Sequence, residues 1–307
     1  MIGVFLASFQ IKGCALGPLV LVLLISLRYR GKALPRKLRN EAVLMIQEKL
    51  EAVYQHYNRR KYVDPDPLLF LYDYPEARDR EITGIVAACL AYGRVEMIMK
   101  TVGGVLEKMG PSPFGFLSNT RERTIDSVFS GFKYRFATDV HLSNLLKGIK
   151  GVIKEFGSLE GCFSAGAGKP DETVVTGLSR LYQGLNQRGP TGHLLADPNK
   201  TSACKRSHLF LRWMVRKDSV DPGGWESVSP CQLIIPLDTH MYKIGTMLGF
   251  TRRKSPDRIC AFEITAGFRE LQVMDPVKYD FSLTRFGIQR DLDMDELKRF
   301  FTSHDLP

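Results

Sequence analysis

The stretch Leu233–Gly249, LIIPLDTHMYKIGTMLG, carries the clearest structural signal in the chain. An apolar run reaches Pro236, and Asp238 then precedes three apolar residues at helical spacing: Met241, Ile244 and Leu248. We therefore expect Asp238 to cap a helix over residues 239–248 by accepting hydrogen bonds from the backbone N–H groups of its first turn. Because a helix N-terminus favours the ionised carboxylate, Asp238 would serve as a fixed anion or a base rather than as a general acid.

Upstream of this stretch, Ser202–Lys217 (SACKRSHLFLRWMVRK) is strongly basic. Four of its residues are three or four positions apart and so share one helix face: Lys205, His208, Arg212 and Arg216. A solvated basic face on a core helix would explain this pattern without any function. Cations without acidic partners are costly, however, unless an anion such as phosphate lies nearby. A lysine among cations also has an electrostatic reason to lose its proton, as a nucleophilic amine must.

Farther outward, apolar periodicity and capping residues predict helices over most of the chain. The predicted segments are 41–57, 79–92 (with Asp79 as N-cap), 94–109, 139–156, 172–186, 202–217, 239–248, 256–271 and 276–286. Residues 164–170 and 187–201 are rich in Gly, Ser, Asn and Pro and are predicted to be loops. Only Leu233–Ile235 has strand character. The sequence therefore predicts an all-α fold of about ten helices around a single core, over residues 45–307.

Residues 1–44 are a separate N-terminal extension in this interpretation. Gly13–Leu27 is an apolar run that is short for a membrane span, and cations follow it without a small-residue cleavage site. Three explanations remain open: a start assigned too early, with Met45 opening the protein; a weak membrane anchor; or export. If the run is an anchor, a membrane-tethered helical scaffold is a possible function, and the following cations would hold the domain in the cytoplasm.

Charge and cysteine content narrow the function classes further. The net charge is +10, of which residues 1–39 hold +7 (seven Lys/Arg and no acid), so 10 − 7 leaves +3 for residues 40–307. Bulk basicity of the predicted domain is thus weak support for nucleic acid. The six cysteines include no C-x-x-C and no zinc spacing, which is typical of reduced cytoplasmic thiols. Nothing after Cys260 could supply the closely spaced ligands of a C-terminal iron–sulfur cluster, and we expect no metal or cofactor.

The residues also carry a family resemblance. Residues 234–251 resemble the P-V-D-T-H-V-x-R-(I/V)-x-x-R-L-G stretch of the HhH-GPD superfamily of DNA glycosylases, whose catalytic carboxylate corresponds to Asp238. Residues 81–113 are similar to that superfamily's early helix pair, whose turn faces DNA and is here Tyr92-Gly93-Arg94. Residues 45–288 also look like an uncharacterised bacterial family with the glycosylase fold, through DPDPL, ACLAYGR, SACKR…LRWMVR, PLDTH and DPVKYDF.

One motif of the superfamily is diverged or missing. Most members have a Gly-rich hairpin, L-P-G-V-G-x-x-(T/K)-A, that binds a DNA phosphate and can carry the nucleophilic lysine. Here the corresponding residues 218–231, DSVDPGGWESVSPC, do not match. In the archaeal 8-oxoguanine glycosylase branch, the lysine instead opens a longer helix well upstream of the aspartate. That layout is similar to Lys205, which precedes Asp238 by 238 − 205 = 33 residues, and it favours Lys205 over Lys217 as the nucleophile.

The resemblance implies a DNA glycosylase that excises a damaged base from double-stranded DNA in base-excision repair. Asp238 would stabilise positive charge on the sugar, and Lys205 would attack it and form a Schiff base, which adds AP-lyase activity. If water attacks instead, the enzyme would be monofunctional. The other implied roles are phosphate binding by Arg206, Arg212, Arg216 and Lys243, filling of the duplex gap by Tyr92 or Arg94, and base stacking by Trp213 or Trp225.

An alternative explanation for Trp213 is that it belongs to the hydrophobic core. The main alternative function is a DNA- or RNA-binding protein that has kept the glycosylase fold and lost the chemistry, which the missing hairpin motif favours. In either case we expect a cytoplasmic monomer that associates with the nucleoid when it binds DNA.

Overall fold

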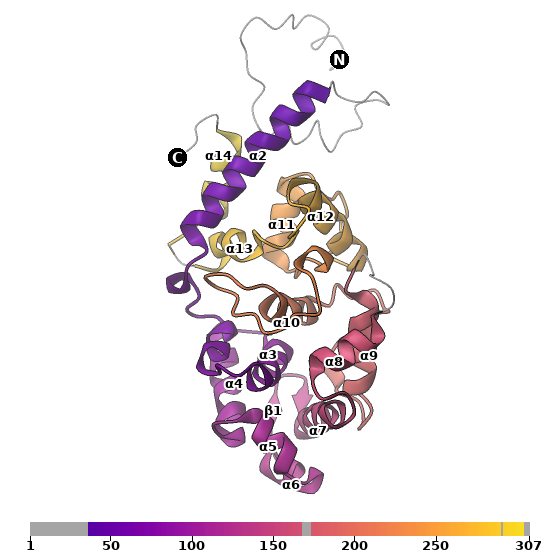
Figure 1. Ribbon diagram of the computed structural model, residues 1–307. Helices are drawn as coiled ribbons and strands as arrows, with labels where there is room; N and C mark the ends of the chain where they lie inside the picture. Colours follow the sequence, from indigo (N-terminus) through magenta and orange to yellow (C-terminus); the bar gives the residue numbers. More distant parts are fainter. Residues whose placement is uncertain (1–35, 168–172, 290, 304–307) are drawn as a thin grey trace, which may run out of the picture.

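The structure, a computed structural model, describes residues 36–167, 173–289 and 291–303, and this part of the chain is predominantly helical. Helix α10 (Lys205–Val215) lies at the centre, between two groups of helices (Figure 1). The first group is α3 (Ala77–Leu90), α4 (Val95–Met109), α5 (Pro113–Asn119), α6 (Glu122–Val128), α7 (Asp139–Phe156), α8 (Leu159–Gly166) and α9 (Val175–Leu185). The second is α2 (Arg36–Tyr57), α11 (Thr239–Met247), α12 (Arg258–Leu271), α13 (Asp280–Ile288) and α14 (Met294–Thr302). The all-α prediction is confirmed, with more helices than the expected ten.

Short elements connect these helices. A two-stranded antiparallel hairpin, β1 (Lys133–Tyr134) and β2 (Ala137–Thr138), stands between α6 and α7. Four 3₁₀ turns occur in the described residues: η1 (Arg60–Tyr62), η2 (Pro67–Asp73), η3 (Gly192–Leu194) and η4 (Pro230–Gln232). Leu233–Ile235, the predicted strand, pairs with no other strand in the described chain. The segment is extended but buried between helices, where Ile235 N–H donates to the Thr265 hydroxyl at 3.0 Å.

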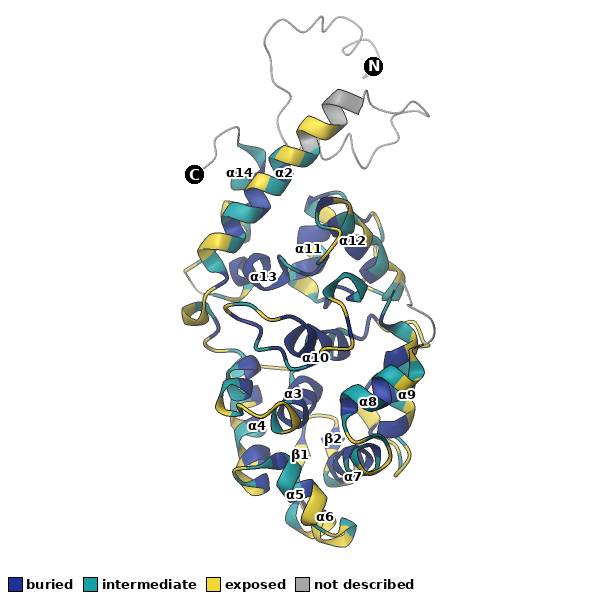
Figure 2. Ribbon diagram, viewed as in Figure 1, coloured by how far each residue is buried: buried dark blue, intermediate teal, exposed yellow. Residues whose placement is uncertain are grey.

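The core runs through α3 and α10. Residues 81–90 of α3 are all buried, and this helix is dark blue in Figure 2. A Cβ on Gly84 would lie only 3.3 Å from the Phe210 ring of α10, so a glycine there lets the two helices pack closely. The same hydrophobic cluster extends from Ile46 in α2 to Phe301 in α14.

Several predicted boundaries agree with the structure, and one predicted cap is wrong. The predicted helix 139–156 is α7, and Gly110 ends α4 with a left-handed φ of 77°. Asp79, however, lies within the first turn of α3, and its carboxylate accepts from the Ser112 hydroxyl and from Phe114 N–H, both at 2.8 Å. Asp79 thus binds the beginning of the next but one helix, α5, instead of capping its own.

Helix α2 packs along α13 and α14 and joins the beginning of the described chain to its end (Figure 1). Lys49 is 1% exposed, and its ammonium donates to the carbonyl oxygens of Phe300 and Ser303, both at 2.6 Å. Because α2 begins at Arg36, the predicted boundary between residues 44 and 45 falls inside a helix. The apolar run Gly13–Leu27 lies outside the described residues. Among the helices that are described, none has the length and hydropathy to cross a bilayer.

Candidate functional site

Asp238 begins helix α11, as the sequence predicts. Its Oδ1 accepts from the backbone N–H groups of His240 at 2.9 Å and Met241 at 2.8 Å. This capping fixes the carboxylate and leaves Oδ2 free for another partner. That partner is Lys205, whose Nζ lies 3.4 Å from Oδ2.

Lys205 is the first residue of α10. The preceding Cys204 has φ 46°, a left-handed conformation that is uncommon for a residue other than glycine. Such local strain persists only where the surrounding structure enforces it, and it is frequent at functional sites. The Lys205 side chain is 37% exposed and that of Asp238 16% exposed. The pair is therefore partly desolvated yet still reachable from solvent.

A cavity of about 250 Å³ opens beside the Lys205 amine. It lies between the end of α3, the loop that precedes α10, and the first turn of α10, and its lining is Ala91, Tyr92, Ala196, Ser202, Cys204, Lys205, Arg206 and Ser207. Ser207, which also lines the cavity, is 3% exposed. The hollow therefore offers an amine, a guanidinium and a hydroxyl from the first turn of one helix. Asp238 does not line this cavity itself. Larger hollows lie between α2 and α12, between α11 and α14, and where α2 meets α13 and α14, and neither Lys205 nor Asp238 lines them.

Arg206, expected to bind phosphate, is engaged within the protein. Its guanidinium donates to the carbonyl oxygens of Cys89, at 2.7 Å, and His193. It also lies over the Tyr92 ring, 4.9 Å from the centroid. These contacts join α10 to the end of α3 and to η3. The Arg206 side chain is thus fixed by these contacts, and the residue forms part of the cavity wall.

Arg212 and Arg216, also expected to bind phosphate, are buried ion-pair partners, so this expectation is wrong. Each is 3% exposed. Arg212 contacts Asp280 at 2.5 Å and Asp221 at 3.2 Å. Burial alone would lower the pKa of Arg212, but the carboxylates of Asp221 and Asp280 more than offset it and the pKa is raised. The acidic partners of Arg216 are Asp218, Asp221 and Asp275.

The residues after α10 explain this burial, because they fold back over the C-terminal end of the helix. Gly223 N–H donates to the Trp213 carbonyl at 3.0 Å, and Trp225 N–H donates to the Met214 carbonyl at 2.9 Å. The resemblance places the phosphate-binding hairpin at residues 218–231. These residues instead donate hydrogen bonds to the last backbone carbonyls of α10, and their aspartates neutralise the charges of its arginines.

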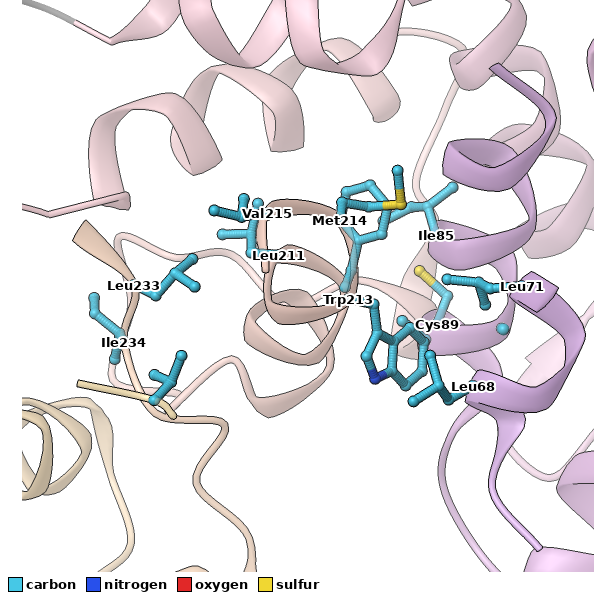
Figure 3. Packing of buried hydrophobic residues seen from close by; sticks show 14 of the residues in the cluster. Leu68, Leu71, Ile85, Cys89, Leu211, Trp213, Met214, Val215, Leu233 and Ile234 are labelled. Carbon is cyan, nitrogen blue, oxygen red and sulfur yellow. The ribbon is translucent and has the colours of Figure 1, made fainter. Parts of the chain in front are cut away.

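Neither tryptophan is available to stack on a base. Trp213 is fully buried and packs toward Leu68 and Cys89 in the core between α10 and α3 (Figure 3). Trp225 is 5% exposed, and its indole N–H donates to Glu81 at 3.1 Å. The apolar spacing of α10 is thus a core pattern, and the base-stacking expectation for Trp213 and Trp225 is wrong.

Tyr92 and Arg94, expected in a DNA gap, lie at the α3–α4 turn beside the cavity. The Tyr92 hydroxyl donates to the Tyr134 carbonyl at 3.0 Å, and the Tyr134 hydroxyl donates to the Tyr92 carbonyl. Tyr92 is thereby fixed and half-buried, whereas Arg94 is exposed. Lys243, one turn after Asp238 on α11, is also exposed.

The sequence analysis missed the β1–β2 hairpin, whose tip is Arg135–Phe136. Phe136 is 64% exposed, and its ring centroid lies 5.1 Å from that of His193. The His193 ring in turn lies 4.8 Å from the Tyr92 ring, which lines the cavity. The only signal available in the sequence was an aromatic residue beside an arginine in a short, unpatterned segment.

Two buried titratable groups lie behind the pair. His208 is one turn along α10 from Lys205, and burial lowers its pKa to about 4. Asp280, at the start of α13, has its pKa raised to about 6, mainly by burial, against the effect of Arg212 and with a further contribution from the negative charge of Asp238. Asp280 Oδ1 is buried and has no hydrogen-bond partner in the described structure. Across the described ranges, no three His, Cys, Asp or Glu side chains gather as metal ligands would.

The fold and the site together define a helical protein in which a lysine at one helix N-terminus meets an aspartate at another. The family model described as "Protein of unknown function (DUF2400)" matches residues 66–289, and the chain belongs to this family. Neither a curated protein nor a solved structure matches the chain.

Proposed function

We propose that the protein is a DNA glycosylase with AP-lyase activity, in which Lys205 is the nucleophile and Asp238 the fixed anion. The observation that carries this proposal is the 3.4 Å approach of Lys205 Nζ to Asp238 Oδ2, beside a cavity, by residues 33 positions apart. A purely structural ion pair has no need of a cavity, of partial exposure or of a strained residue such as Cys204. The HhH-GPD type of fold, suggested by the motif resemblance, is part of the proposal.

The chemistry assigned to the pair is base displacement on a deoxyribose. Asp238 accepts a proton from the Lys205 ammonium, and the free amine attacks C1′ of the sugar. A bond forms between Nζ and C1′ while the bond from C1′ to the base nitrogen breaks. Its electron pair leaves with the base, which takes up the proton that Asp238 had accepted, so that Asp238 is again an ionised carboxylate. During this step the sugar has oxocarbenium character, and a carboxylate a few ångströms away stabilises the positive charge.

The cavity supplies a place for the displaced base. A base must leave the stack to be reached by an active site, and extrusion into a pocket is the usual solution. The hollow at the start of α10 has the Lys205 amine at its wall and the Ser207 hydroxyl to hydrogen-bond a base edge. The sugar of such a nucleotide would lie at the mouth, within reach of Nζ.

Borohydride trapping on DNA with an abasic site tests the lyase half without knowledge of the preferred base. The native chain should form a covalent adduct with the abasic strand, because the Schiff base is reduced to a stable amine. Lys205→Gln should abolish the adduct. Lys217→Gln, an exposed lysine at the end of the same segment, is the matched control and should leave it unchanged. An adduct that persists in Lys205→Gln contradicts the assignment.

Asp238→Asn tests the second role. Asparagine is also a good N-cap, so the helix should remain intact while the anion is lost. We expect base release to fall by at least 100-fold, with DNA affinity changed by less than about threefold, because the oxyanion-type contribution of one fixed group is of this order. Retained turnover in Asp238→Asn would remove the carboxylate from the mechanism.

A second candidate is a DNA-binding protein of the same fold without catalysis. Residues 218–231 favour it, because they stabilise α10 where a phosphate-binding hairpin would be expected. In this case neither borohydride trapping nor base release should occur on a panel that contains uracil, 8-oxoguanine and abasic sites. DNA affinity should then be equal in the native chain, Lys205→Gln and Asp238→Asn.

A further inference from the structure

The β1–β2 hairpin presents a largely exposed apolar ring, Phe136, which His193 and Arg135 contact on part of its surface. Phe136 is 64% exposed at a tip where the chain reverses in two residues, since Tyr134 pairs with Ala137. A phenylalanine ring left largely in water forgoes the stabilisation that burial would give. A phenylalanine at this position therefore indicates a partner surface more than a packing role.

The tip is held in place by its neighbours. The Tyr92 and Tyr134 hydroxyls each donate to the other residue's carbonyl, which fixes the hairpin against the α3–α4 turn. Gly93 adopts φ 102°, and a Cβ there would lie only 2.8 Å from the Arg135 guanidinium. Arg135 itself has φ 51°, a strained value for a residue other than glycine. A conformation maintained against such strain is more typical of a functional element than of an incidental loop.

The rings near the tip lead from it to the cavity. The Phe136, His193 and Tyr92 rings are successive neighbours, with centroids 5.1 Å and 4.8 Å apart, and Tyr92 lines the cavity beside Lys205. Desolvation and the positive charges of Arg206 and Arg135 lower the pKa of His193, which keeps its ring neutral at pH 7. Phe136 and His193 are both exposed to solvent, and the Arg135 guanidinium lies 5.7 Å from the Phe136 centroid.

Exposed cations are close to two of these rings, Tyr92 and Phe136, along the chain. Arg94, Lys133 and Arg135 are exposed, and none has an ion-pair partner among the residues that the structure describes. Aromatic rings interleaved with cations are the arrangement by which proteins bind single-stranded nucleic acid, since bases stack on the rings and phosphates approach the cations. The residues expected to hold a duplex backbone instead make contacts inside the protein. Arg212 and Arg216 are buried, and residues 218–231 fold onto α10.

We propose that the surface formed by Arg94, Lys133, Arg135, Phe136 and His193, here called the hairpin surface, binds unpaired bases of single-stranded DNA next to the cavity at Lys205. This proposal rests on the proposed function and narrows its substrate: the target nucleotide lies in a single-stranded or locally unpaired region. In such DNA the base is already free of its partner, so the cost of extrusion is smallest.

Fluorescence anisotropy with the full-length Asp238→Asn chain tests this directly. The probes are a labelled 20-nucleotide DNA with one abasic site, the same strand in a duplex, and an RNA of the same length. We expect tighter binding of the single strand than of the duplex. Phe136→Ala should weaken single-strand binding by about 5- to 150-fold, which corresponds to the ~1–3 kcal/mol of one base–aromatic stack. Phe136→Trp should restore it, because stacking requires only a flat ring.

Met274→Ala is the matched control, because Met274 is 70% exposed on a distant loop. It should leave all affinities unchanged, and the thermal unfolding midpoints of both alanine variants should equal that of the parent. The proposal is overturned if the duplex binds more tightly than the single strand, or if Phe136→Ala and Met274→Ala bind it equally. Equal or tighter binding of the RNA would replace DNA by RNA as the partner.

The abasic-site trapping described above separates this proposal from the proposed function. Trapping with unaffected single-strand binding in Phe136→Ala refutes the hairpin surface and leaves the glycosylase. Loss of single-strand binding in Phe136→Ala without any trapping supports the surface and refutes the catalytic assignment.

Discussion

The two ends of helix α10 carry cations on one face and use them in opposite ways. At the N-terminal end, Lys205 lies beside a cavity and contacts one half-buried carboxylate at 3.4 Å. At the C-terminal end, Arg212 and Arg216 are enclosed by acids that belong to other segments. At the first end the charged group remains accessible to solvent, whereas at the second end the charges are buried in ion pairs.

The difference follows from what covers each end. The chain returns over the C-terminal end of α10, and Asp218 and Asp221 arrive with it, while Asp275 and Asp280 come from the approach to α13. The N-terminal end meets the turn of α11 that Asp238 caps, the end of α3, and the loop that precedes α10. A buried ion-pair network holds the helix in position, and that fixed position brings Lys205 to Asp238.

The largest expected effect is at the buried end. Arg212→Met should lower the free energy of unfolding by about 3–5 kcal/mol, because it leaves the carboxylates of Asp221 and Asp280 buried without their cation. Urea denaturation at pH 7 measures this value. Arg252→Met, at an exposed arginine, should change it by less than about 0.5 kcal/mol. An Arg212→Met protein as stable as the parent would mean that the network does not hold α10.

His208, between the two ends, gives a pH-dependent effect of intermediate size. Its pKa is about 4 in the folded protein, below the ordinary value of 6.5, because burial disfavours the charged form. The unfolded chain therefore takes up a proton first as pH falls, and the associated stability is complete above pH 6.5 and lost between pH 6.5 and 4. From pH 7 to 4.5, the native chain should lose about 2–3 kcal/mol more than His208→Leu.

The quantity that tests His208 is the difference in the free energy of unfolding between the native chain and His208→Leu. Asp280 and Glu81 have raised pKa values of about 6 and 7, so their contributions change in the opposite direction over part of this range. Both residues are present in both proteins, and their contributions cancel in the difference. If the free energy of unfolding had the same pH dependence in the native chain and in His208→Leu, protonation of His208 would not destabilise the folded protein.

Arg206 should give a smaller loss. Arg206→Met removes the donors to the Cys89 and His193 carbonyls and the contact with the Tyr92 ring, which should cost about 1–2 kcal/mol. Thermal or urea unfolding measures it, and Arg206→Lys should recover only part, since an ammonium cannot reproduce the two-pronged geometry. Full recovery by lysine would mean that the charge alone matters here.

Lys205 should give the smallest effect on stability. Lys205→Gln should change the free energy of unfolding by less than about 0.5 kcal/mol, because a partly exposed ion pair contributes little. The same variant should lose borohydride trapping altogether, so stability and activity separate at this end of the helix. A loss of several kcal/mol would class Lys205 with Arg212 as a structural cation.

Local patterns in the sequence predicted the local structure well. The helical period of residues 139–156 and the Asp238 cap depend on neighbours within one or two turns, and both are confirmed. The family resemblance drew attention to Lys205 and Asp238 together, and the structure places their charged groups in contact. Their catalytic roles stay predictions.

Features that depend on distant residues could not be predicted in the same way. Asp280 pairs with Arg212 across 68 positions, and no spacing rule indicates such a contact. The cations of residues 202–217 therefore seemed to lack acids that the fold supplies from elsewhere. The β1–β2 hairpin was missed because strands of two residues are too short to show an alternating pattern.

The hydrogen bonds from Lys49 to the end of α14 have a consequence for how the chain folds during its synthesis. Its acceptors, Phe300 and Ser303, lie 251 and 254 positions downstream. As the polypeptide leaves the ribosome, α2 is made first among the described helices but cannot complete its interior bonds until nearly the whole chain has emerged. The apolar face of α2 and the Lys49 ammonium therefore stay without their partners for most of the synthesis, and early chaperone contact with α2 is advantageous. A stop codon before residue 300 should yield a product that is rapidly degraded.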